Sequence, residues 1–196
     1  MAEDISRKIA EADFLFQNSL VRVVANRSSP EIKLVGLAVG PFEEGNQYEI
    51  QFWVAEELEK PGIVFFREGQ LLDLAQIIKI ETRQRPLPAS QIYKLPYQFF
   101  YPKMRRYLLK LRTEAPKTPE KMSEYKKARD WCQDIVNHRL KKIITLASTP
   151  SQMGQILLDD LASEERLLYE ILHKCIREWA TKIFDSEEET AGEDRI

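Results

Sequence analysis

Residues 32–66 read IKLVGLAVGPFEEGNQYEIQFWVAEELEKPGIVFF, and the hydrophobic period changes twice within this stretch. Residues 32–39 form a β-rich run, and residues 48–51 begin a second strand-like run after a turn. Apolar side chains then recur at helical spacing over residues 52–58, and residues 63–66 return to a strand pattern. The stretch therefore predicts a small β-module with one inserted helix.

The sequence on either side of this module predicts one more strand and a series of helices. Alternation and β-branched residues predict the first strand at residues 20–25. Helical spacing of apolar residues predicts helices at about 5–16, 71–83, 102–112, 119–146, 155–161 and 163–184. The expected fold class is α+β, with a small N-terminal β-rich domain followed by an all-α domain of four or five helices.

These elements suggest a domain boundary near residue 67. We expect residues 1–66 to form the β-rich domain with its N-terminal helix, residues 67–184 to form a helical assembly domain, and the acidic residues 185–196 to be disordered. Trp53 is expected in the core of the β-rich domain. A helix of about 28 residues spans about 42 Å, so part of the helix at 119–146 is expected to project or to pack on another chain.

Bulk composition is that of a globular protein without a membrane segment. With 196 residues, 43% of them hydrophobic, the chain can bury a sizeable core. No apolar run approaches the roughly 20 residues that a membrane span requires, and the N-terminus lacks the apolar segment of a secretory signal. Cys132 and Cys175 fall inside helical patterns, where a buried free thiol is common. We expect an intracellular protein without a disulfide.

The net charge of −2 hides an uneven distribution of charge along the chain. Residues 1–66 carry a net charge of −5, residues 67–147 carry +10, and residues 148–196 carry −7. A basic middle between two acidic ends is compatible with a nucleic-acid ligand, an acidic partner or association of unlike ends. It is equally compatible with helices whose solvent-exposed sides are rich in lysine and arginine.

The sequence offers no recognisable catalytic, metal or cofactor site. His138 and His173 both lie within predicted helices, and no nucleophile elbow accompanies them. Their spacing to Cys132 and Cys175 does not match structural zinc sites. A phosphate-binding glycine loop is also missing from the sequence. We therefore expect no enzyme activity, no metal and no cofactor.

Aromatic and basic side chains interleave in the stretch from residue 92 to residue 112. Such a composition can bind single-stranded nucleic acid by charge and stacking, and it is also enriched at protein interfaces. We favour the interface, because a single chain of net charge −2 is a poor autonomous DNA binder. The candidate interface residues are Tyr97, Phe99, Phe100, Tyr101, Arg105, Tyr107, Trp131 and Arg139.

Three motifs stand in an order and spacing that match a known family: Gly40-Pro41-Phe42, Phe52-Trp53-x-Ala55-x-x-Leu58 and Asp134-x-x-x-x-Arg139-Leu140-x-Lys142-Ile143. Together they resemble the GINS subunits of the archaeal and eukaryotic replicative helicase assembly. The similarity is to the type whose small β-domain precedes its helical domain, as in the eukaryotic Psf two/three subunits, and overall it points to the archaeal branch. Residues 92–107 depart from the family pattern because they are more aromatic and more often interrupted by proline.

The resemblance implies a non-catalytic scaffold in DNA replication, located in the cytoplasm at the nucleoid, or in the nucleus of a eukaryote. It implies a second, related GINS subunit as partner in a heterotetramer. It also implies bridging of the MCM helicase and a Cdc45/RecJ-like nuclease, a link to primase or DNA polymerase, and DNA contact only in the assembled complex. The alternative is a nucleic-acid-binding accessory protein that uses the basic residues 103–142 directly.

The spacing of Asp134 and Arg139 predicts how the long helix is used. Five residues separate the two side chains by about 140° around a helix, so they cannot form a local i to i+4 ion pair. Each is expected to reach a partner on another helix. The planar fork of arginine suits a carboxylate there, which indicates that Arg139 orients helices or subunits and does not touch DNA.

Overall fold

The computed structural model describes residues 2–34, 36–88, 91–149 and 158–191. Its contacts divide the chain into two compact units. We call Ala10–Gln76 with Tyr101–Tyr125 the β-unit, and Met1–Ile9, Ile77–Phe100 and Lys126–Ile196 the helical unit. No helix within the described ranges combines the length and the apolar composition that crossing a bilayer requires.

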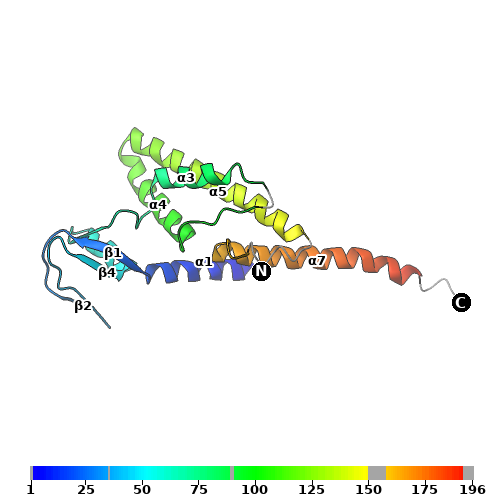
Figure 1. The fold of residues 1–196 in the computed structure, drawn as a ribbon, viewed down its shortest axis with the longest axis horizontal. Helices are drawn as coiled ribbons and strands as arrows, with labels where there is room; N and C mark the ends of the chain where they lie inside the picture. Colours follow the sequence, from blue (N-terminus) through cyan, green and yellow to red (C-terminus); the bar gives the residue numbers. More distant parts are fainter. Residues whose placement is uncertain (1, 35, 89–90, 150–157, 192–196) are drawn as a thin grey trace. The chain divides into compact units, whose positions relative to one another are not determined.

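The β-unit is built on a three-stranded antiparallel sheet in the order β4-β1-β5. Strand β1, Leu20–Ala25, follows helix α1, Ala2–Gln17, and lies between β4, Gln47–Gln51, and β5, Val64–Phe66. Figure 1 shows β1 and β4 side by side in blue and cyan. Alternate side chains of β1 are buried, as the sequence predicts: Val21, Val23 and Ala25.

The inserted helix is α2, Phe52–Glu59, and it buries Phe52, Val54, Ala55 and Leu58. The helix is therefore confirmed, but Trp53 is less buried than expected. Phe52 is 2% exposed, whereas Trp53 is half-buried. Successive residues of a helix point about 100° apart, so the neighbour of a fully buried residue turns toward the edge of the packed face.

Residues 32–39 do not form one strand. They form a hairpin of β2, Ile32–Leu34, and β3, Leu37–Val39, in antiparallel register. Gly36 adopts a positive φ of 79° between the two strands, a conformation that glycine allows and other residues rarely adopt. The sequence pattern treated Gly36 as part of a continuous run and missed this turn.

The helices of the second half follow the predicted periodicity with shifted ends. Helix α3, Leu74–Gln84, begins after Asp73, whose carboxylate accepts from the Gln76 amide at 2.7 Å while the Gln76 side chain accepts from the Asp73 amide. This reciprocal cap places the start three residues later than predicted. Helix α4, Phe100–Glu114, leads through the short 3₁₀ turn η1, Ala115–Lys117, into α5, Pro119–Ser148.

The long helix α5 confirms the predicted length, with 30 residues. The Thr118 hydroxyl accepts from the Lys121 amide at 3.3 Å and caps the helix, and Pro119 occupies its first position. Figure 1 shows α3 alongside α5, and the Gln84 side-chain amide donates to the Ile135 carbonyl at 3.2 Å between them.

Helix α7, Ser163–Ala191, completes the helical unit. Its first turns pack on a small core made of Ile92, Ile143 and Leu161, with Leu158, Leu168, Tyr169 and Leu172 against it. The helix continues seven residues past the predicted end at Phe184, because no glycine or proline interrupts the sequence before Gly192. The first three residues of the short helix expected at 155–161, and the last five residues of the expected tail, lie outside the described residues.

Candidate functional site

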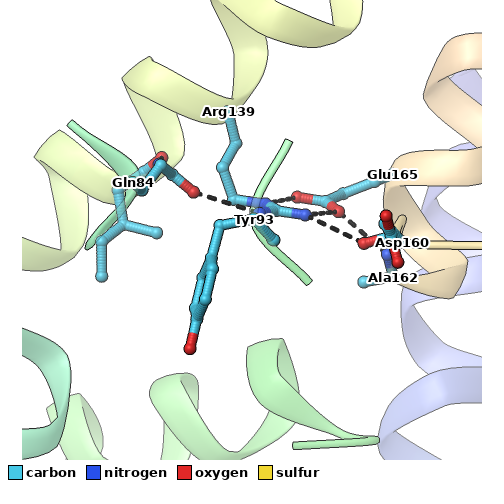
Figure 2. A network of polar contacts seen from close by, with 7 residues as sticks. Gln84, Tyr93, Arg139, Asp160, Ala162 and Glu165 are labelled. Carbon is cyan, nitrogen blue, oxygen red and sulfur yellow. Dashed lines mark hydrogen bonds and ion pairs between the residues drawn. The ribbon is translucent and has the colours of Figure 1, made fainter. Parts of the chain in front are cut away.

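Arg139 on α5 is the centre of a polar network inside the helical unit (Figure 2). The side chain is 0% exposed. Its guanidinium binds both carboxylate oxygens of Glu165, with 2.6 Å between Nη2 and Oε2. Nη1 donates to the Gln84 side chain at 3.0 Å and to the Tyr93 carbonyl at 2.7 Å, and Nη2 donates to the Asp160 carbonyl at 3.5 Å. One side chain thus joins four separate segments of the unit.

The partners of Arg139 are themselves held in place. Glu165 Oε2 also accepts from the Ala162 amide at 2.9 Å, which caps the start of α7. The Gln84 carbonyl accepts from Lys142 Nζ at 3.1 Å. Burial and the neighbouring Arg139 charge lower the pKa of Lys142. The network is therefore fully connected and buried, which is typical of a structural site.

A second cluster lies on the same α3–α5 seam. Glu81 is fully buried, with Arg85 Nε at 3.3 Å and His138 Nδ1 at 2.7 Å from its Oε1. The Arg85 guanidinium lies over the Trp131 ring at 5.6 Å and is 3.9 Å from Asp134. Arg139 therefore reaches another helix, as expected, whereas Asp134 reaches Arg85 in the turn that follows α3.

Arg105 and Lys103 on α4 tie this helix to other parts of the β-unit. Arg105 Nη2 lies 2.6 Å from Asp13 Oδ1 on α1. Lys103 Nζ donates to the Gln70 carbonyl at 2.9 Å, and burial lowers the pKa of this lysine. The contacts explain why residues 101–125 group with the β-module. Separability of residues 1–66 from residues 67–184 stays a prediction.

Arg106 makes the third of these contacts. Its guanidinium pairs with Glu56 on α2 and lies over the Phe52 ring at 5.6 Å. We call Lys103, Arg105 and Arg106 the α4 clamp. The basic middle of the sequence thus supplies partners to the acidic first segment through the clamp and to the acidic last segment through the Arg139–Glu165 pair.

Replacing Arg106 with glutamine is expected to lower the free energy of unfolding by about 1 to 2 kcal/mol, because it removes a half-exposed ion pair and a cation–π contact. The matched control is Arg112→Gln, an exposed position of the same helix. Chemical denaturation of the full-length variants measures the difference. Equal stability of the two variants would contradict a clamping role.

The candidate interface residues are divided between the two units. Tyr97, Phe99 and Phe100 belong to the helical unit with Trp131 and Arg139, whereas Tyr101, Arg105 and Tyr107 belong to the β-unit. Phe100 and Arg139 are buried within this chain, and the other six are half-buried. Their contribution to a subunit interface stays a prediction.

Groups that could carry chemistry are engaged in packing. Within the described ranges no three His, Cys, Asp or Glu side chains form a group that could hold a metal. Burial raises the pKa of the Cys132 thiol to about 12, so this thiol is protonated and unreactive at neutral pH. His173 stacks on Tyr169, with ring centroids 5.6 Å apart.

Exposed apolar side chains on α7 were not among the candidate residues. Trp179 is 67% exposed, Ile183 53% and Phe184 70%. Trp179 and Ile183 fall within the helix that the sequence predicts at 163–184, but the sequence analysis assigned no role to its apolar face. The feature that could have indicated this exposure is the length of the apolar face of α7, which continues beyond the residues that pack on the core of the unit.

Two family models match the chain in succession. The PSF2 N-terminal domain model matches residues 8–62, and the GINS complex protein helical bundle domain model matches residues 71–184. Among curated proteins, the human DNA replication complex GINS protein PSF2 is 27% identical over 92 residues, which are 44% of this chain and 50% of that protein. The match thus spans about half the length of the human relative.

Proposed function

The chain belongs to the GINS complex protein family, and we propose that it is a non-catalytic scaffold subunit that assembles with other GINS subunits in DNA replication. The observation that carries the proposal is the succession of the two family models over the β-module and the helices. The name of the human relative, a DNA replication complex protein, agrees with it.

We further propose that the assembled complex bridges the MCM helicase and a Cdc45/RecJ-like protein, with primase or DNA polymerase as further contacts. A heterotetramer with a second, related GINS chain is the expected form. Its place of action would be the chromosome, in a nucleoid or a nucleus. The assignment to the archaeal branch stays a prediction.

A direct nucleic-acid role for residues 103–142 finds less support. Many basic side chains in this segment already make contacts inside the chain, among them Lys103, Arg105, Arg106, Lys121, Arg139 and Lys142. A DNA-binding role would need the exposed remainder, such as Lys110, Lys117 and Lys126, where acidic residues intervene. Measuring the affinity for DNA at increasing salt concentration separates the scaffold function from direct DNA binding, because phosphate contacts make that affinity fall steeply with salt.

The proposal is tested by co-expressing the full-length chain with the other GINS subunits of its source organism. Native mass spectrometry of the purified complex gives the stoichiometry, and pull-down with the MCM helicase and the Cdc45/RecJ-like protein tests bridging. A chain that stays alone with every GINS subunit would contradict the assembly role. A stable complex that captures neither further protein would contradict only the bridging role.

A further inference from the structure

We draw no further inference here: the strongest candidate, the exposed apolar surface patch that Trp179 and Ile183 form on α7, carries none, because nothing in the structure shows what covers it.

Discussion

Replacing Arg139 with methionine is expected to lower the free energy of unfolding by about 3 to 5 kcal/mol, because it leaves a buried carboxylate without its counter-charge. Glu165 is 3% exposed and receives both bonds of the arginine fork. The Gln84 side chain and the Tyr93 carbonyl lose a donor at the same time. Methionine fills much of the volume of the arginine side chain but donates no hydrogen bond to any of these groups.

Three further variants separate charge from geometry. Arg139→Lys keeps the charge but loses the bidentate fork, so an intermediate loss is expected. Arg139→Met combined with Glu165→Met removes both charges and is expected to recover part of the stability. Lys141→Met, at an exposed position two residues away on α5, is the control.

Chemical denaturation measures the losses, and hydrogen exchange locates them. Faster exchange is expected in α3, α5 and the start of α7, the segments that the network joins. If Arg139→Met lowers the free energy of unfolding no more than Lys141→Met does, the central role of Arg139 is contradicted. An unchanged stability with a flatter salt dependence of DNA binding would instead favour the nucleic-acid function of residues 103–142.

The Arg139 network shows how far spacing along a sequence can predict a site. The five residues between Asp134 and Arg139 exclude a local pair, and this much was predictable from helix geometry. The identity of the partner was not, because Glu165 lies 26 residues away. Acidic residues such as Glu164 and Glu165 at a helix start are explained by the helix dipole alone, so their position did not indicate a distant arginine.

The same limit applies to the fold. Strand β1, helix α2 and the long helix α5 follow from local periodicity and end signals, and they were predicted. The grouping of α4 with the β-module depends on contacts such as Arg105 with Asp13, 92 residues apart. A row of basic residues has the same sequence signature whether it binds phosphate or pairs inside the chain. The excess of positive charge in residues 67–147 therefore could not distinguish phosphate binding from ion pairing within the chain.

The surface of α7 illustrates a different limit. Periodicity identifies the apolar face of a helix but does not tell how much of that face the chain itself covers. Tyr169 and Trp179 belong to one face by spacing, yet the first packs on the core and the second is 67% exposed. Only the three-dimensional extent of the core separates an intramolecular contact from a surface for a partner.

Phe52→Ala is expected to lower the free energy of unfolding by about 3 to 5 kcal/mol, through lost burial and the cavity left behind. Phe52 lies where several elements of the β-unit meet. Its ring is 4.3 Å from the Phe16 ring of α1 and 5.4 Å from the Phe66 ring of β5, and the Arg106 guanidinium of α4 lies over it at 5.6 Å. Rigid neighbours on several sides limit how far the cavity can collapse, which favours the upper part of this range.

The decisive comparison is with Trp53→Ala, one residue further along α2. Trp53 is larger, but it is half-buried, so its truncation exposes less new apolar surface and leaves no closed cavity. We expect its loss to be about half that of Phe52→Ala, with hydrogen exchange in β1, β4 and β5 accelerated mainly by the Phe52 variant. A greater loss for Trp53→Ala would restore the tryptophan as the core anchor of the module. Normal stability of Trp53→Ala combined with weaker binding of a GINS subunit would instead identify Trp53 as an interface residue.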